Sequence, residues 1–376
     1  MGLRPVSGTA AVAVPPSSSH ELRAIGARLR NAGLTARALA AWAGTARVAA
    51  LPARLEAMPA RPPTPAEAIL ALFVAGAEVA CDRLRAPPAV PALIDELIAH
   101  QLVERDGDRL RARVAIVPLG PALLVCDRLD APVERALVCW PDDSSHHLAT
   151  AIPPGRRADW LDLGCGSAFA PLARPELAAR SIGVDLNERA VRYARLGAAL
   201  SGISHVAISL GDVAAACEPA ALVTCNAPIP DLLRGDRSRS AAQPGWGSPD
   251  AASLASAELP STERSGAAAT PPATALDELW HRAEPGFFDR LWPALRSAVR
   301  PGGMIVVHAA CEAVLPILAD AGGERVVVTY TPASVRGFAV AWWRPDAHDR
   351  FVAARRALTP DRPHLDPRDR EDVLAG

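Results

Sequence analysis

A short apolar run that ends in two glycines, W-L-D-L-G-C-G at residues 160–166, is the stretch of this sequence with the clearest chemical meaning. Gly164 and Gly166 lack a Cβ atom, so the backbone can turn tightly there and a ligand can approach it closely. A second apolar run, S-I-G-V-D, ends on Asp185, 19 residues after Gly166. A glycine turn after one strand, with an acid about 20 residues later at the end of the next, is typical of a βαβ unit that binds a nucleoside. The acid in such a unit bonds the ribose hydroxyls.

The residues around the turn indicate which nucleoside. A dinucleotide fingerprint needs a third glycine, G-x-G-x-x-G, whereas this chain has G-C-G-S-A-F from Gly164, which disfavours a nicotinamide-dependent oxidoreductase. The run D-L-G-C-G-S, which starts at Asp162 and includes Cys165, resembles the first motif of the class I S-adenosylmethionine-dependent methyltransferases. In that family the loop passes under the methionine and ribose parts of the cofactor. Ala168 stands where the family usually has glycine.

The resemblance covers about residues 158–343 and continues at the next two strand ends. G-V-D-L, at 183–186, is similar to the family's second motif, which implies that Asp185 binds the ribose and Leu186 lies against the adenine. Asp212, in the G-D-V that follows the third expected strand, matches the acid that accepts from the adenine amino group. The resemblance therefore implies S-adenosyl-L-methionine as cofactor, bound by Asp162, Gly164, Cys165, Gly166, Asp185, Leu186, Asp212 and Val213.

After the fourth expected strand the chain carries N-A-P-I-P at 226–230, which resembles the N-P-P-Y box of methyltransferases that modify planar nitrogen atoms. Those enzymes include release-factor glutamine methyltransferases and ribosomal RNA N-methyltransferases. Methyl transfer needs a nitrogen lone pair aimed at the methyl group, and a side-chain amide with a neighbouring carbonyl can hold it so. The resemblance implies these catalytic roles for Asn226 and for the Ala227 carbonyl, with Pro228 giving rigidity. Ile229 replaces the family's aromatic residue, which removes stacking worth about 1–3 kcal/mol for a base.

The stretch P-D-D-S-S-H-H, at 141–147, lies between two strand-like runs (122–126 and 136–140) and the glycine turn. Asp142, Asp143 and Ser144 are loose matches to a loop that closes over the cofactor in the glutamine methyltransferases. His146 and His147 are adjacent and have no acid-rich ligand set nearby, so we interpret them as exposed or capping residues and predict no metal site.

From residue 158 onward, strand-like and helix-like runs alternate, which predicts an α/β fold. We expect a Rossmann-like, mostly parallel, seven-stranded sheet with helices on both faces. Its strands are expected at 160–163, 181–185, 206–209, 222–226, 304–308, 324–330 and 337–343. Helices are expected at 169–179, 187–200 and 287–299, and one more at 348–358.

The N-terminal part of the chain has a different pattern. Leu22, Ile25 and Leu29 share one helical face, and further helix-like runs extend to about residue 101. An Asp-Gly turn at 106–107 between two short runs predicts a β-hairpin. Short helices followed by a hairpin predict a mainly helical, winged-helix-like domain. Residues 1–120 carry a net charge of +4, but acids alternate with the arginines of the hairpin, so the pattern does not decide between a protein and an RNA partner.

These patterns predict the following division: a disordered segment at 1–18, a winged-helix-like substrate-recognition domain at 19–118, a β linker that covers the cofactor at 119–157, a class I methyltransferase domain at 158–345 with a low-complexity insertion at 234–274, and a charged tail at 346–376.

Bulk composition narrows the class of protein. The formal net charge is −1, so no overall field attracts nucleic acid or membrane surfaces. Seven scattered cysteines without a C-x-x-C pattern favour reduced thiols and a cytoplasmic location. No apolar run is long enough for a signal peptide core or a membrane span, so we expect neither.

The sequence thus predicts an S-adenosylmethionine-dependent N-methyltransferase that acts on a macromolecule, either a glutamine amide of a translation protein or a ribosomal RNA base. Ala168 and Ile229 favour one alternative, a degenerate and non-catalytic cofactor-binding or scaffolding protein of the same fold.

Overall fold

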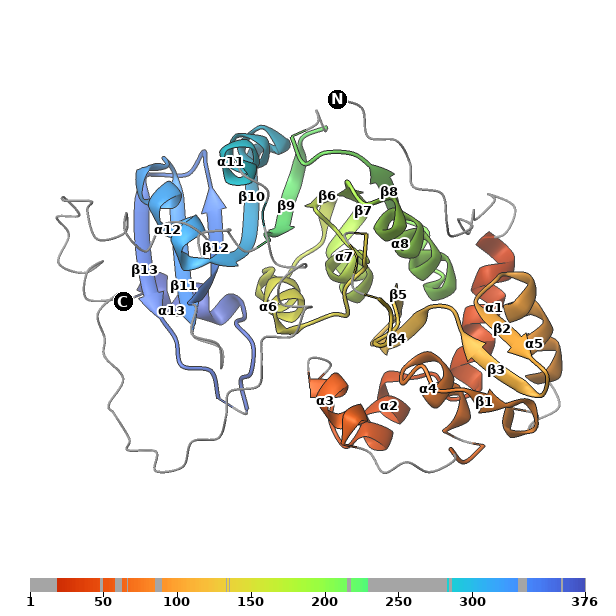
Figure 1. Cartoon of the computed structure of the whole chain (residues 1–376). Coiled ribbons are helices and arrows are strands. Elements are labelled where there is room, and N and C mark those ends of the chain that lie inside the picture. Colours follow the sequence, from red (N-terminus) through yellow and green to blue (C-terminus); the bar gives the residue numbers. More distant parts are fainter. Residues whose placement is uncertain are drawn as a thin grey trace, which may run out of the picture.

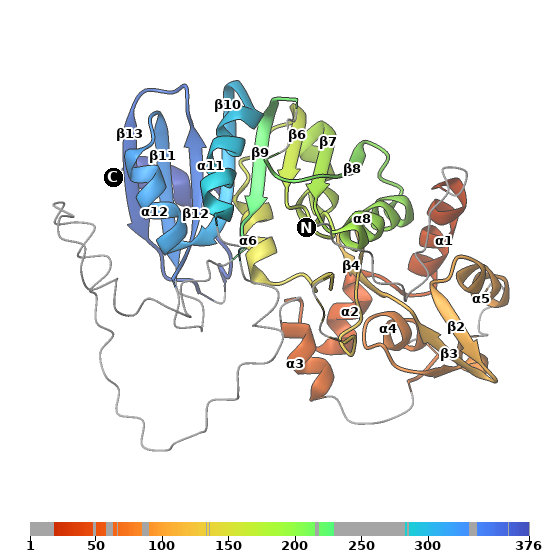
Figure 2. The same cartoon turned by 45° about the horizontal axis from the view of Figure 1, so that its top comes forward.

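The fold is built on an eight-stranded sheet of order β13-β11-β12-β10-β9-β6-β7-β8, which Figure 2 shows from left to right. Neighbouring strands are parallel, except that β12 runs antiparallel to both β10 and β11. The mixed α/β architecture with a mostly parallel sheet is therefore as predicted, but the number of strands is eight and not seven. The strands are β6 (Arg157–Leu163), β7 (Ala178–Asp185), β8 (Val206–Leu210), β9 (Ala220–Asn226), β10 (Val299–Ala310), β11 (Glu324–Tyr330), β12 (Phe338–Arg344) and β13 (Arg350–Arg355).

This computed structural model describes residues 19–47, 50–57, 63–65, 67–84, 90–132, 134, 136–214, 218–228, 283, 286–330, 337–359 and 361–375. The predicted disordered segment at 1–18, the insertion at 234–274 and Ile229 lie outside these residues. Within the described ranges, none of the helices combines the length and the apolar character that crossing a membrane requires.

Helices cover both faces of the sheet because successive strand residues point to opposite sides. Trp160 packs into the hydrophobic cluster on one face, together with helices α6 (Asp143–Ala151), α7 (Phe169–Ala173) and α8 (Glu188–Ser201). Its neighbour Leu161 packs into the cluster on the other face. There the sheet is covered by α11 (Phe287–Ala298) and α12 (Cys311–Asp320).

The N-terminal part forms a helical unit with a small antiparallel sheet of order β1-β3-β2. The predicted hairpin is confirmed as β2 and β3, and Gly107 in its turn has φ 58°. Figure 1 shows the unit below and to the right of α8, and Figure 2 shows α1 beside α8. Its elements are α1 (Ser19–Asn31), α2 (Ala36–Ala43), α3 (Leu51–Glu56), α4 (Ala68–Phe73), β1 (Val79–Ala80), the 3-10 helix η3 (Cys81–Leu84), α5 (Val90–Ala99), β2 (Val103–Asp106) and β3 (Arg109–Ala112).

The N-terminal unit and the large sheet share one hydrophobic cluster. Helix α1 crosses α8 so closely that a Cβ atom at Gly26 would overlap the carbonyl oxygen of Leu200. The hairpin of β4 (Ala115–Leu119) and β5 (Ala122–Cys126) lies between the two parts, and β5 packs against α8. The two parts are therefore packed together as one body and are not joined by a free linker.

Three sequence predictions of secondary structure are wrong. The run at 136–140 is not a strand. The carbonyl of Val138 accepts from the amide of Asp127, and the amide of Val138 donates to the carboxylate of Asp127, so these groups do not pair with a neighbouring strand. The helix expected at 169–179 ends at Ala173, and the 3-10 turn η4 (Pro175–Leu177) follows at once because proline cannot continue the helix. The helix expected at 348–358 is strand β13, which pairs in parallel with β11.

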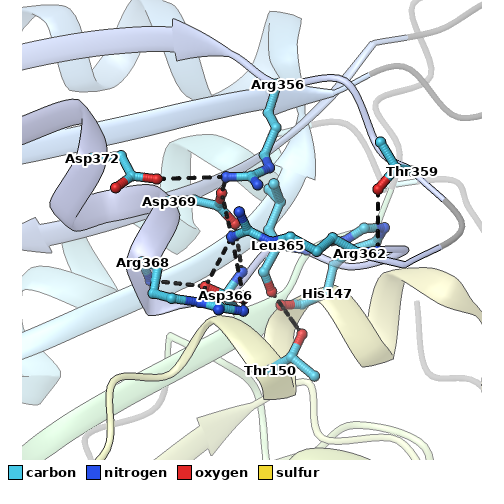
Figure 3. Close-up of polar contacts among 10 residues, drawn as sticks. All are labelled: His147, Thr150, Arg356, Thr359, Arg362, Leu365, Asp366, Arg368, Asp369 and Asp372. Atoms are coloured by element: carbon cyan, nitrogen blue, oxygen red, sulfur yellow. Dashed lines mark hydrogen bonds and ion pairs between the residues drawn. The ribbon is translucent and has the colours of Figure 1, made fainter.

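The segment predicted as a charged tail is part of the packed fold. After β13 the chain crosses α6, where the amide of Leu365 donates to Nδ1 of His147 and its carbonyl accepts from the hydroxyl of Thr150 (Figure 3). Leu365 is fully buried. The chain then ends in α13 (Pro367–Ala375).

A buried carboxylate holds this C-terminal segment in place. Asp369 is 1% exposed, pairs with Arg356, and lies 3.2 Å from Nη2 of Arg362 (Figure 3). Its second oxygen accepts from the amide of Asp366 at 2.7 Å. Several of the charges that suggested a charged tail are therefore paired, among them those of Arg356, Arg362, Asp366 and Asp369.

We expect Asp369→Ala to lower the free energy of unfolding by about 3 kcal/mol, because it leaves two arginines without their buried partner. Asp372 is the matched control, since it is 70% exposed and 3.9 Å from Arg356. Asp372→Ala should change the same quantity by less than about 0.5 kcal/mol. Urea unfolding of both variants tests this, and equal effects would contradict the role of Asp369.

Candidate active site

The predicted site residues lie at one edge of the sheet, where β6, β7, β8 and β9 end. Leu163 of β6 is in register with Val184 of β7 and Cys225 of β9. The residues that follow these three positions, among them Gly164, Asp185 and Asn226, therefore leave the sheet beside one another. The carboxyl edge of parallel strands is where open α/β sheets bind ligands.

The glycine turn leaves open space above the end of β6. The amides of Gly164 and Cys165 both donate to the carbonyl of Val184, at 2.8 and 3.0 Å, which ties the turn to the end of β7. Gly164 and Gly166 have φ values of +66° and +53°, and a Cβ atom on either would meet nothing within 4 Å. A ligand can therefore lie directly on this backbone.

Asp185 joins the glycine turn to α8. Its Oδ2 accepts from the amide of Gly166 at 2.7 Å, and its Oδ1 accepts from the amide of Asn187 at 2.8 Å. Burial raises the pKa of the Asp185 carboxyl above its usual value, while these backbone donors act in the opposite direction. Each oxygen keeps a further lone pair, so the carboxylate can still accept from ligand hydroxyls.

Leu186 and Asp212, the two residues predicted to lie on the adenine side, are both accessible to solvent. Leu186 is 64% exposed, so its side chain is accessible to a ligand. Asp212 is partly exposed in the loop after β8, and its Oδ1 accepts from the amide of Ala214 at 2.8 Å. Val213 beside it is also partly exposed. Gly211 ties this loop to the end of β7 by donating to the carbonyl of Asp185 at 3.0 Å.

Asp162 and Cys165 lie beneath the turn. Asp162 is 4% exposed and accepts from the hydroxyl of Thr224 at 2.5 Å, and that hydroxyl accepts from the indole of Trp160 at 2.7 Å. Burial raises the pKa of the Asp162 carboxyl to about 7. Burial also raises the pKa of the Cys165 thiol. The structure therefore gives these two side chains a supporting position under the loop.

Ala168 begins α7 in the left-handed region, with φ 57° and ψ 41°. Together with Gln101 it is one of two non-glycine residues with positive φ among the described residues. This conformation costs an L-residue roughly 1–2 kcal/mol, which gives a physical reason for the glycine usually found at this position of the motif.

The segment before α6 is bonded to Asn187, two residues after Asp185. The side-chain amide of Asn187 donates to the carbonyl of Ala136 at 3.0 Å. Burial, with the nearby charges of Asp142 and Asp185 among the smaller causes, raises the pKa of the Cys139 thiol.

Asn226 is held on both sides by hydrogen bonds. Its Nδ2 donates to the hydroxyl of Ser144 on α6 at 2.8 Å, and its Oδ1 lies 2.8 Å from Nδ1 of His308 on β10. The amide of Ala227 donates to the carbonyl of His308 at 2.9 Å. Pro228 follows as the last described residue of this box. The structure thus brings Ser144, a loose match in the sequence, next to Asn226.

Sequence reasoning missed His308 and Tyr330, which are 2% and 3% exposed. His308 follows the apolar run 304–307 in β10, and Tyr330 is the last residue of β11, so each lies near the carboxyl end of its strand, as Asp185 does. Nε2 of His308 lies 2.5 Å from the hydroxyl of Tyr330.

The interpretation of His147 as an exposed or capping residue is wrong. His147 is 1% exposed and its ring lies 4.1 Å from that of Tyr330. Burial lowers its pKa to about 3, and its Nδ1 accepts from Leu365, which is distant in sequence. His146 is half-buried and stacks on His364 at 5.0 Å.

No known family model matches this sequence. Several solved structures show a partial likeness to it. A putative class I S-adenosylmethionine-dependent methyltransferase of Listeria monocytogenes is 15% identical over 65% of this chain and 72% of its own, with a TM-score of 0.37. An N-methyltransferase of Bradyrhizobium japonicum in complex with S-adenosyl-L-homocysteine is 15% identical over 54% of this chain and 85% of its own, with a TM-score of 0.33.

A ribosomal protein methylase of Lactobacillus delbrueckii is 16% identical over 54% of this chain and 76% of its own, with a TM-score of 0.32. All three likenesses are partial in coverage and low in sequence identity.

The buried carboxyl of Asp162 makes stability depend on pH. Its pKa is about 7 in the folded protein, against 3.8 for an unperturbed aspartate. The folded state therefore holds more protons between these values, and this contribution to stability is lost as pH rises from about 4 to 7. We expect Asp162→Asn to gain stability relative to the unaltered protein over this range, by on the order of 3 kcal/mol.

Urea unfolding at pH 5 and pH 8 measures this change in the free energy of unfolding. Asp159→Asn is the control, because Asp159 is an acid on the same strand but is paired with Arg300. A difference between Asp162→Asn and the unaltered protein that stays constant with pH would contradict a raised pKa.

Proposed function

We propose that this protein is an S-adenosylmethionine-dependent N-methyltransferase. One observation carries the proposal: an open glycine turn bonded to Asp185 ends one strand, and an amide side chain, Asn226, ends the strand beside it. A nucleoside-binding turn and a group that can hold a planar nitrogen therefore face the same space.

The residues at the turn fit the cofactor that the proposal requires. Gly164 and Gly166 offer bare backbone, and Asp185 offers two carboxylate oxygens that are already oriented by backbone amides. The exposed Leu186 gives an apolar contact for a base. Asp212 keeps a carboxylate oxygen that is not used by the amide of Ala214 and can accept from an amino group.

When bound, S-adenosylmethionine supplies a methyl group, which forms a bond to the acceptor nitrogen as its bond to sulfur breaks and the electron pair passes to sulfur. Asn226 would hold the acceptor through the free lone pair on Oδ1 and the free N–H on Nδ2. The carbonyl of Ala227 would accept a second N–H of the acceptor. Fixing the nitrogen in line is the main contribution of such a site, and the proton on nitrogen passes to water after transfer.

We expect Asp185→Ala to weaken binding of S-adenosyl-L-homocysteine by about a hundredfold or more, since charge-assisted hydrogen bonds are worth about 1.5–3 kcal/mol each. Asn226→Ala should keep this affinity and lose methyl transfer to cell extract. Glu188→Ala, at an exposed position at the start of α8, is the matched control and should change neither. Titration calorimetry and transfer of labelled methyl groups measure the two properties.

Unchanged affinity of Asp185→Ala would contradict the cofactor site. Methyl transfer that is absent from the unaltered protein despite normal binding would indicate the non-catalytic alternative.

The N-terminal unit is proposed to recognise the acceptor as a winged-helix-like domain. The order of α4, β1, η3, α5, β2 and β3, together with the sheet order β1-β3-β2, supports this. Helix α5 contains Asp95 and Glu96 and no basic residue, and Glu96 pairs with Arg28 of α1. In the hairpin, Arg111 lies within 4.0 Å of Glu104 and 3.3 Å of Asp130. Such a surface favours a protein acceptor over ribosomal RNA.

We therefore expect the acceptor to be a glutamine amide of a translation protein. After incubation of the full chain with labelled S-adenosylmethionine and ribosome-containing extract, the label should be released by protease and retained after ribonuclease treatment. The Asn226→Ala protein provides the background. Label released by ribonuclease would overturn this expectation and assign an RNA base.

A further inference from the structure

Five side chains form one continuous line of hydrogen bonds through Asn226. The Tyr330 hydroxyl lies 2.5 Å from Nε2 of His308, and Nδ1 of His308 lies 2.8 Å from Oδ1 of Asn226. On the other side, Nδ2 of Asn226 lies 2.8 Å from the Ser144 hydroxyl, which lies 2.5 Å from Oδ1 of Asp142. The five residues come from β11, β10, β9, α6 and the residue before α6, so the line crosses the carboxyl edge of the sheet.

The imidazole of His308 has a single proton in this environment. Its ring is buried, packs at 5.6 Å on Phe338, and lies 6.2 Å from the ring of His147. Burial lowers its pKa to about 4, so near neutral pH it is uncharged. A neutral imidazole donates through one nitrogen and accepts through the other.

The two ends of the line specify the same direction for every bond in it. Tyr330 has one hydroxyl proton, and His308 is its hydrogen-bond partner among the described residues, so a buried donor is satisfied when Tyr330 donates to Nε2. At the other end the carboxylate of Asp142 can accept and cannot donate, so the Ser144 proton points to it. The Ser144 oxygen must then accept from Nδ2 of Asn226.

We propose that Tyr330 and His308 are positioning residues for the transfer reaction, which fix the amide of Asn226 in one of its two orientations by holding His308 as the Nδ1–H tautomer. In this orientation Oδ1 of Asn226 faces His308, and its remaining lone pair receives an N–H of the acceptor. With the opposite tautomer the amide would turn over, and its NH2 group would face the nitrogen that has to be held. The reaction role rests on the proposed function, whereas the tautomer is a property of the protein alone.

The tautomer is tested first, in the full chain without ligand. In protein labelled with ¹⁵N-histidine, long-range ¹H–¹⁵N correlation spectra distinguish the Nδ1–H form, the Nε2–H form and the charged form of an imidazole. The His308→Asn protein identifies the signals of His308. We expect the Nδ1–H form in the unaltered protein at pH 7 and a larger share of the Nε2–H form in Tyr330→Phe, in which only the Asp142 end still specifies the direction of the bonds. The Nε2–H or the charged form in the unaltered protein would overturn the proposal.

Phe338→Leu is the matched control, because Phe338 contacts the His308 ring without a hydrogen bond. This variant changes packing around the ring and should leave the Nδ1–H tautomer in place. A mixture of tautomers in Phe338→Leu as large as that in Tyr330→Phe would mean that packing fixes the ring, and it would overturn the role of the hydroxyl.

The reaction role is tested by single-turnover transfer of labelled methyl groups to extract, with enzyme in excess. We expect Tyr330→Phe and Ser144→Ala each to slow transfer about tenfold or more, with unchanged affinity for S-adenosyl-L-homocysteine, since a small misplacement of a positioning group can slow a reaction by up to about a hundredfold. Transfer at the unaltered rate by Tyr330→Phe would overturn the proposal. No transfer by the unaltered protein, together with the expected tautomer, would overturn the proposed function and the reaction role and leave the direction of the hydrogen bonds established.

Discussion

The site depends on the way Asp185 ties three strand ends together. Its carboxylate accepts from the turn after β6 and from the first residues of α8, and its carbonyl accepts from the loop after β8. A single residue at the end of β7 therefore sets the position of the glycine turn, of the helix start and of Asp212. Because the partners of Asp185 in these contacts are backbone groups, the geometry of the glycine turn follows largely from the parallel sheet itself.

The surroundings of Asn226 are built differently. Asn226 is positioned by side chains from α6 and β10, and α6 is in turn held by the C-terminal segment through Leu365. The glycine turn thus depends on residues within about 50 positions of it, whereas Asn226 depends also on His308 and, through α6, on Leu365 near the C-terminus.

This difference between local and long-range contacts explains which parts of the site could be predicted from the sequence. The strand ends and Asp185 can be recognised from neighbouring residues alone, because a short apolar run that stops at a glycine or an acid is typical of a buried strand followed by a turn. The contact of His147 with Leu365 joins residues 218 positions apart, and no spacing rule connects them. Strand β13 was missed for the same reason, because R-F-V-A-A-R fits a helix as well as a strand and only the free edge of β11 decides between them. His308 carried a usable signal at the end of an apolar strand, but its partners Tyr330 and Asn226 come from other strands.

The close crossing of α1 and α8 at Gly26 has a consequence for the selection of substrates. The N-terminal unit cannot swing toward or away from the sheet without opening a shared hydrophobic cluster. Under the proposed function, a partner bound to that unit reaches the methyl donor across a fixed span. Selectivity then depends on distance. A partner is modified when its target nitrogen lies at the right distance from the surface that binds the N-terminal unit, and a target with the correct local sequence at another distance is not modified.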